Sequence, residues 1–133
     1  MTAETLDRPQ LTPFDLMGGR DTVRRFVDRF YDLMDEDPAY APLRALHAPD
    51  LGPMRESLTG FLTAWLGGPR DWFDARPGAC IMSAHAKVAI TRDTATQWMS
   101  AMTRALEDTG IKPDVRAQVA AAFARMAQGM AMR

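Results

Sequence analysis

One histidine late in the chain, His85, is the first candidate for a chemical role, because it lies within the largely apolar stretch CIMSAHAKVAI of residues 80–90. A neutral imidazole on an apolar surface could ligate a metal ion or a haem iron. The commoner fate of such a histidine is a place in the core, where its ring nitrogens bond to backbone groups. On this stretch alone, the pattern favours a core histidine.

Three further side chains carry polar atoms at places where they could act together. Tyr31 lies on the apolar face of an expected helix, and a buried phenol needs a hydrogen-bond partner. Trp98 lies on the inner face of a later helix, and its indole can only donate. His47 follows a short helix, in a loop that could be exposed to solvent. Each of these side chains, taken alone, more often packs or bonds to the backbone.

Other kinds of chemistry find little support in the sequence. There is no Walker-type loop, no GxGxxG after a strand, no HExxH motif and no nucleophile elbow. The carboxylates of Asp35, Glu36 and Asp37 cluster at a helix end, where a solvated cap is the usual role. Cys80 as a nucleophile would need a nearby base, and its spacing from His85 does not guarantee contact.

The composition is that of a globular protein with one domain. Of the 133 residues, 47% are hydrophobic and 25% are charged, and the net charge is −1 with both signs interspersed. This balance argues against nucleic acid or an anionic membrane as a partner. A single cysteine allows no intrachain disulfide, and no export signal is evident, so a cytoplasmic location is expected. We expect a flexible tail over residues 1–12 and one domain over residues 13–133.

The periodicity of the apolar residues predicts an all-α fold, since no stretch alternates with a period of two. We expect residues 70–78 to form an ordered loop with aromatic anchors. In the first half of the chain we expect helices over residues 13–17 after an N-cap at Thr12, from an N-cap at Asp21 to the Asp37-Pro38 pair, and in a short segment from there to about Leu46. In the second half we expect a helix over residues 53–66 that ends at Gly67-Gly68-Pro69, and a helical turn over residues 79–86. A helix over residues 92–107 should follow an N-cap at Thr91, and the last helix should begin at Pro113.

Taken together, the polar residues and their surroundings resemble the group II truncated haemoglobins, which are compact globins with a two-over-two helical sandwich around a haem. The similarity is carried by FVDRFYDLMDEDPAY at residues 26–40, FLTAWLGGPRDW at residues 61–72, the Gly18-Gly19 pair, and a histidine followed thirteen residues later by a tryptophan, His85 and Trp98. The resemblance implies haem b as the cofactor and the same two-over-two fold.

The resemblance also implies a role for each matching residue. His85 would be the proximal ligand of the haem iron, and Tyr31 and Trp98 would donate hydrogen bonds to a bound ligand. His47 falls where the family places a Tyr, Phe or His. The apolar residues that would surround the haem are Met54 and Leu58 on the distal helix, Phe61 and Leu62 on the pocket wall, and Phe30, Met82, Val88, Ile90 and Met102 around them.

The sequence departs from the family pattern next to the proximal histidine. Many members carry an arginine at this point, which pairs with a haem propionate, but here Ala84 precedes His85. Lys87 or Arg76 could take the place of that arginine, and we favour these two over Arg70. The proximal side is correspondingly more apolar.

The function implied by the resemblance is reversible binding of dioxygen and other diatomic ligands by a monomer or homodimer. Nitric oxide detoxification or peroxidase-like activity would need an external reductase, because the sequence contains no flavin or nicotinamide module. The alternative is a haem-free helical module for interaction or signalling that keeps the globin frame. In that case His85 is a packed core residue, and Tyr31 and Trp98 are ordinary aromatic side chains.

Overall fold

The structure, a computed structural model, describes residues 11–76 and 90–131, and all the regular secondary structure in these ranges is helical. This result confirms the predicted all-α fold. The elements are α2 (Pro13–Met17), α3 (Arg20–Glu36), the 3-10 helix η1 (Pro38–Tyr40), α4 (Ala41–Arg44), α5 (Gly52–Trp65), α6 (Asp71–Asp74), α8 (Arg92–Asp108) and α9 (Pro113–Ala131).

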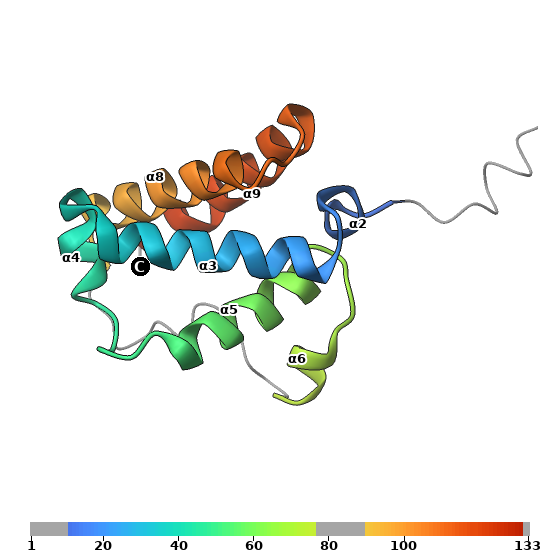
Figure 1. The fold of residues 1–133 in the computed structure, drawn as a ribbon, viewed down its shortest axis with the longest axis horizontal. Coiled ribbons are helices and arrows are strands. Elements are labelled where there is room, and N and C mark those ends of the chain that lie inside the picture. Colours follow the sequence, from blue (N-terminus) through green and yellow to red (C-terminus); the bar gives the residue numbers. More distant parts are fainter. Residues whose placement is uncertain (1–10, 77–89, 132–133) are drawn as a thin grey trace, which may run out of the picture.

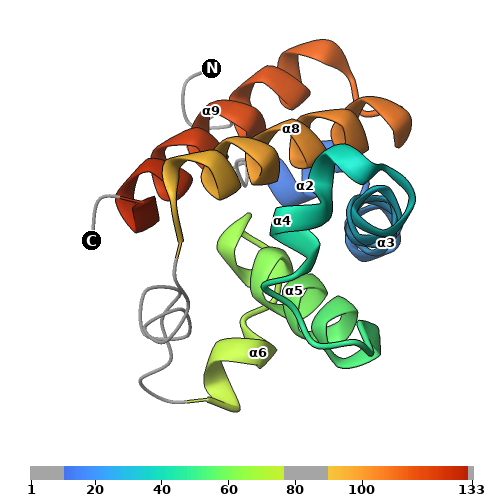
Figure 2. The ribbon, with the colours of Figure 1, turned by 90° about the vertical axis from the view of Figure 1, so that its left-hand side faces the viewer.

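The long helices form two pairs, α3 with α5 and α8 with α9. Figure 1 shows α3 crossing the middle of the molecule, with α5 on one side and α8 and α9 on the other. Seen from the end, α8 and α9 lie above α3 and α5, and α3 packs against both α5 and α8 (Figure 2). None of the described helices is long and apolar enough to cross a membrane.

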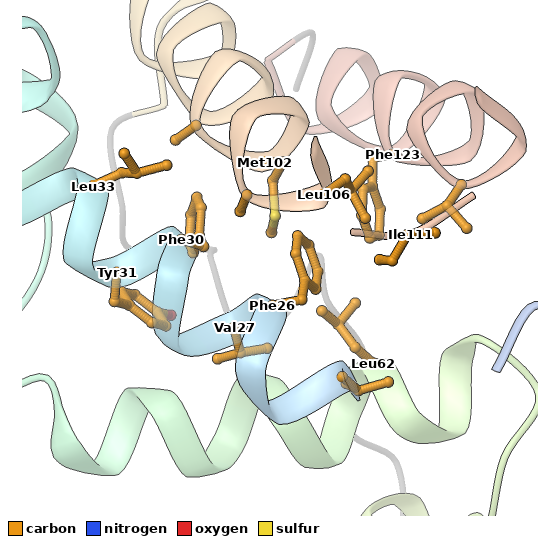
Figure 3. Packing of buried hydrophobic residues seen from close by; sticks show 14 of the residues in the cluster. Phe26, Val27, Phe30, Tyr31, Leu33, Leu62, Met102, Leu106, Ile111 and Phe123 are labelled. Carbon is orange, nitrogen blue, oxygen red and sulfur yellow. The ribbon is translucent and has the colours of Figure 1, made fainter. Parts of the chain in front are cut away.

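The core forms around the apolar face of α3. Phe26 and Phe30 are at most 1% exposed, and they point from α3 toward α8 and α9, where they meet Met102 and Phe123 (Figure 3). Val27 lies on the side of α3 that faces α5. Because α3 buries side chains toward both neighbours, its apolar stripe is wider than that of a helix packed on one side only.

Two helix starts follow the predicted capping chemistry. The Thr12 side-chain oxygen accepts a hydrogen bond from the Asp15 backbone N–H at 3.2 Å, which caps α2. The Thr91 side-chain oxygen accepts one from the Thr94 backbone N–H at 3.1 Å, which caps α8. Both N-cap predictions are confirmed, and each cap satisfies a backbone donor that the helix itself cannot pair.

The predicted start of α3 is wrong. The N-cap is Gly19 rather than Asp21, and the helix begins at Arg20. Gly18 and Gly19 have φ angles of 115° and 83°, so the chain turns directly from α2 into α3 without a side-chain cap. Asp21 falls in the first turn, where its negative charge interacts favourably with the positive end of the helix dipole.

The short helix after Pro38 ends earlier than predicted. Its regular part stops at Arg44, not at about Leu46. Beyond this end, two hydrogen bonds join residues three apart. The Leu46 N–H donates to the Leu43 carbonyl at 3.1 Å, and the His47 N–H donates to the Arg44 carbonyl at 3.0 Å. Such bonds between residues three apart are typical of a helix end that unwinds into a loop. They place His47 close behind α4.

The predicted loop over residues 70–78 contains the short helix α6, so this prediction is wrong for Asp71–Asp74. Trp72 packs so closely on α5 that a Cβ at Gly60 would lie 2.6 Å from its Cδ1 atom. The absence of a side chain at Gly60 therefore lets α6 dock on α5. The predicted turn over residues 79–86 lies outside the described residues.

The Gly67-Gly68 pair that follows α5 also lies against α2, near the start of the chain. Gly67 has a φ of 101°, and a Cβ there would lie 2.6 Å from the Thr12 Cβ. The Phe14 N–H donates to the Leu66 carbonyl at 3.0 Å. The pair of glycines therefore ends α5 and also gives α2 a place to dock.

Candidate functional site

Three predicted polar residues are joined by a series of ring contacts that includes Phe30. The Phe30 ring lies 4.9 Å from the Tyr31 ring and 6.2 Å from the Trp98 ring, measured between centroids. The Tyr31 ring in turn lies 5.9 Å from the His47 ring, with the two planes at 80°. The tertiary structure thus assembles side chains from α3, α8 and the loop after α4 into one continuous cluster of rings.

Tyr31 is the most enclosed polar residue of this cluster, with only 2% of its surface exposed. Burial raises the pKa of Tyr31 to about 12, and the positive charge of Arg55 partly offsets this rise. The phenol therefore stays protonated and can donate. Among the described residues, none forms a hydrogen bond with the Tyr31 hydroxyl.

His47 is half-buried, and its Nδ1 atom lies 2.9 Å from the Leu43 carbonyl oxygen. A carbonyl oxygen only accepts, so Nδ1 is the donor in this contact. The Leu43 N–H donates at 3.1 Å to the side-chain carbonyl of Gln97, the residue before Trp98. The backbone of one residue, Leu43, therefore links the position of His47 to that of α8.

The apolar residues predicted for the haem surroundings fall into two groups. Leu62 and Met102 are completely enclosed by protein atoms, and Phe30 and Phe61 are nearly so. Leu58 and Ile90 are only half-buried, and Met54 is 37% exposed. The first group can support a pocket wall from behind. The second group presents apolar surface that a ligand could cover.

Two aromatic residues absent from the predicted site belong to the same cluster. The Phe123 ring on α9 stacks on Trp65 at 5.3 Å with an interplanar angle of 14°, and it meets Trp98 edge-on at 5.7 Å. The sequence placed Phe123 on the apolar stripe of the last helix and Trp65 on that of α5. Nothing in their local pattern indicated that they meet, because the contact joins three helices.

Arg70 and Arg76, two of the predicted propionate partners, lie against the aromatic side chains of α6. The Arg76 Cζ atom is 4.8 Å from the Trp72 ring centroid, and Nη1 donates to the Trp72 carbonyl at 3.2 Å. The Arg70 Cζ atom is 5.1 Å from the Phe73 ring centroid. Both charges stay on the surface while their planes cover aromatic rings.

The remaining predicted site residues, His85, Lys87, Met82 and Val88, lie outside the described residues, as does Ala84. Within residues 11–76 and 90–131, no group of three or more His, Cys, Asp or Glu side chains is arranged to hold a metal ion.

The described side chains fit a haem by their chemistry. A large planar apolar group needs aromatic and aliphatic neighbours, and half-buried Leu58, Trp65 and Trp98 are packed against the core. A small polarised ligand beside it needs neutral donors, and the Tyr31 hydroxyl is a buried donor that no described residue engages. These two requirements are met side by side, through Phe30 and Phe123.

Comparison with known proteins identifies the family. The sequence profile described as "Bacterial-like globin" matches residues 12–132. The group 2 truncated hemoglobin YjbI of Bacillus subtilis (strain 168) is 26% identical over 104 residues, which are 78% of this chain and 76% of the relative.

Solved structures agree with the family match. The group II 2-on-2 hemoglobin from Agrobacterium tumefaciens superposes with a TM-score of 0.87 at 29% identity, covering 93% of this chain and 96% of that one. The group II truncated hemoglobin from Bacillus anthracis gives a TM-score of 0.84 at 30% identity, covering 92% of each chain. The chain therefore belongs to the bacterial-like globin family, within its group II truncated haemoglobins, and its helices form the two-over-two fold of that group.

Proposed function

We propose that this chain is a haem b protein that reversibly binds dioxygen and related diatomic ligands. Membership of the globin family implies haem-based ligand binding. The observation that carries the specific proposal is the Tyr31 hydroxyl, which is buried, protonated at neutral pH and engaged by no described residue. A protonated phenol on an apolar helical face is a neutral hydrogen-bond donor that a polar ligand could use.

When bound, haem supplies the ferrous iron at which a diatomic ligand attaches. The roles of the protein are to exclude water and to place donors where the ligand becomes negatively polarised. Tyr31 and Trp98 approach this place from α3 and α8, and their rings are separated by Phe30. Neutral donors in a dry pocket stabilise a polarised ligand more strongly than they would in water, and this stabilisation slows its release.

His47 has a secondary part in the proposal. Its Nδ1 atom lies 2.9 Å from the Leu43 carbonyl oxygen, and this contact fixes the orientation of the ring. Because the His47 ring packs against Tyr31, it can orient the phenol. We do not assign it as an iron ligand in the resting protein. A bis-histidine spectrum abolished by His47→Ala would contradict this role.

His85 is proposed as the proximal ligand, on the strength of its match to the family pattern. Arg76 or Lys87 is proposed to pair with a propionate in place of the arginine that Ala84 replaces. The most apolar residues of the expected pocket contribute haem affinity by burial. Their share is expected to be large here because the usual basic neighbour of the proximal histidine is missing.

The visible spectrum of the purified protein tests the proposal. We expect a Soret band that shifts on reduction with dithionite and again on addition of carbon monoxide, together with a stable oxygenated form in air. His85→Ala should weaken haem retention and remove the histidine-ligated spectrum, whereas His47→Ala should keep it. A colourless protein that does not take up added haemin would overturn the proposal and leave the haem-free interaction module.

Conversion of nitric oxide to nitrate is a further activity that this site could support. The chain would need electrons from an external reductase after each turnover. Mixing the oxygenated protein with nitric oxide and measuring the nitrate formed per haem would test it. A yield well below one nitrate per haem in a single turnover would rule out this activity.

A further inference from the structure

Arg55 on α5 connects the distal helix to α3 at the position of Tyr31. Its Nη1 atom donates to the Asp28 carboxylate and to the Asp28 backbone carbonyl, each at 3.1 Å. Its Nη2 atom donates to the Asp32 carboxylate at 2.8 Å. The two aspartates are one helical turn apart on α3, so the planar guanidinium is held at several points and has little freedom to rotate.

The same guanidinium covers the ring of Tyr31. The Arg55 Cζ atom lies 5.7 Å from the Tyr31 ring centroid, and the Arg55 side chain is only 20% exposed. Tyr31 lies between Asp28 and Asp32 in the sequence of α3. The cation therefore restricts the ring from the α5 side, while Phe30 and His47 contact it from other directions.

Arg55 also fixes the residues beside it on α5. Met54 precedes it, and Leu58 lies three residues later, so the link to α3 sets the distance of this helical turn from Tyr31. Met54 and Leu58 are the more exposed apolar residues of the expected pocket. A shift of α5 away from α3 would move them and open the space beside the phenol.

We propose that Arg55 is a positioning residue for ligand stabilisation, which holds the Tyr31 phenol and the Met54–Leu58 turn of α5 in a fixed relation. This inference rests on the proposed function, because it assigns Arg55 a role in the same site. The positive charge has a second effect in the same direction. It favours ionisation of the phenol and thereby makes the hydroxyl a stronger hydrogen-bond donor.

The chain offers a matched control in Arg104 on α8. Its Cζ atom also lies 5.7 Å from a tyrosine ring, that of Tyr40, and its Nη1 donates to the Asp37 carboxylate at 2.7 Å. Among the described residues, the Tyr40 ring makes no ring–ring contact with the cluster around Phe30. Arg104→Met thus removes a similar ion pair and a similar ring contact at a place that does not touch the proposed site.

The first measurement is the dioxygen dissociation rate of the haem-loaded protein. Arg55→Met should raise it roughly three- to tenfold, because the hydrogen bond from Tyr31 to the ligand is weakened rather than lost, and Arg104→Met should leave it unchanged. Arg55→Lys, which keeps the charge but cannot reach both aspartates in the same geometry, should fall between wild type and Arg55→Met. In a Tyr31→Phe background, Arg55→Met should have a much smaller effect.

A second measurement separates this inference from the proposed function, because it needs no haem. Both tyrosines can be replaced biosynthetically with difluorotyrosine, which has a more acidic phenol, and their fluorine resonances assigned with Tyr40→Phe. Arg55→Met should raise the pKa of the Tyr31 fluorophenol, and Arg104→Met should leave it unchanged. Failure of haem uptake with this shift intact would overturn the proposed function alone.

Two results would overturn the role of Arg55 itself. One is an equal rise in the dissociation rate when Arg55→Met is made with and without Tyr31, because the effect would then not pass through the phenol. The other is an unchanged pKa of the Tyr31 fluorophenol in Arg55→Met protein whose circular dichroism and urea unfolding match those of Arg104→Met.

Discussion

Two tyrosines of this protein have similar surroundings but differ in the hydrogen bonding of their hydroxyl groups. Tyr31 and Tyr40 are 2% and 3% exposed, and each has an arginine Cζ atom 5.7 Å from its ring centroid. Each arginine is paired with aspartate at or just beyond α3, Arg55 with Asp28 and Asp32, and Arg104 with Asp37. The two units are alike in the burial of the tyrosine and in the nearby arginine, but the Arg55 side chain is 20% exposed and that of Arg104 is 44% exposed.

The difference lies at the hydroxyl groups. The Tyr40 hydroxyl lies 2.8 Å from the Ser100 hydroxyl and accepts a hydrogen bond from Arg104 Nη1 at 3.2 Å. The Tyr31 hydroxyl has no such partner among the described residues. The hydrogen bonding of Tyr40 is thus completed within the protein and joins η1 to α8. We propose that a bound ligand completes that of Tyr31.

The largest expected effect separates these two roles. Tyr31→Phe should raise the dioxygen dissociation rate about tenfold to a hundredfold, because a hydrogen bond to a polarised ligand contributes about 1.5–3 kcal/mol. Tyr40→Phe should leave this rate unchanged and lower the free energy of unfolding by about 1 kcal/mol. Stopped-flow ligand displacement and urea denaturation measure the two quantities. Equal dissociation rates in all three proteins would remove Tyr31 from the ligand site.

A second substitution tests whether Trp98 shares the ligand with Tyr31. Trp98→Phe should raise the dissociation rate by a smaller factor, about three- to tenfold, since the ring is kept and only the indole donor is lost. In the double variant the effect should differ from the product of the single effects by a factor of about two or more, because both donors address one ligand. Strict multiplication would indicate that the two donors act on separate groups.

The raised pKa of Tyr31 predicts a loss of stability at alkaline pH. In the folded protein the pKa of the phenol is about 12, against 10.0 for the free group. The contribution of the buried, protonated phenol to the free energy of unfolding is therefore fully present below pH 10, and it is lost as the pH rises toward 12. From these two values the loss at pH 11 is about 1 kcal/mol. Urea unfolding at pH 9 and pH 11 should show this decrease in wild type and a smaller one in Tyr31→Phe.

The smallest effect concerns the acid side of the Tyr40 unit. The Ala39 N–H, and then Arg104, hold the pKa of the Asp37 carboxyl below its ordinary value of 3.8. The stabilisation is therefore present above pH 3.8 and is lost as the pH falls through the lower, folded-state pKa. Asp37→Asn should be less stable than wild type at pH 7, and the difference should shrink below pH 3.8. A constant difference from pH 7 to pH 2 would contradict this assignment.

Much of the helical framework was predictable because its signals are local. Thr12 and Thr91 cap their helices as expected, and Pro113 begins the last one. The errors arose where tertiary contacts outweigh local preference. The Asp21 cap was not used, because two glycines turn the chain directly into α3. Helix α6 was missed, because what stabilises it is the packing of Trp72 on Gly60.

Part of the candidate site could also be predicted from the sequence. The spacing of Tyr31 and Trp98 on apolar helical faces, together with the family pattern, brought both residues into the predicted site. The parts that position them were not accessible in this way. Arg55 has the appearance of an ordinary surface arginine on α5, and Gln97 that of a polar residue beside a tryptophan. Their roles depend on which α3 or α4 groups they meet.

The sequence by itself determined which residues could donate, ligate or line an apolar space, because side-chain chemistry and helical periodicity are properties of short segments. Only the tertiary structure decided which of the two tyrosines has its hydroxyl paired within the described part of the protein. The hydroxyl of Tyr40 meets Ser100, sixty residues away on α8, whereas that of Tyr31 meets no described partner. A hydrogen bond requires atoms within about 3 Å, and for residues so far apart in the chain the packing of helices alone sets that distance.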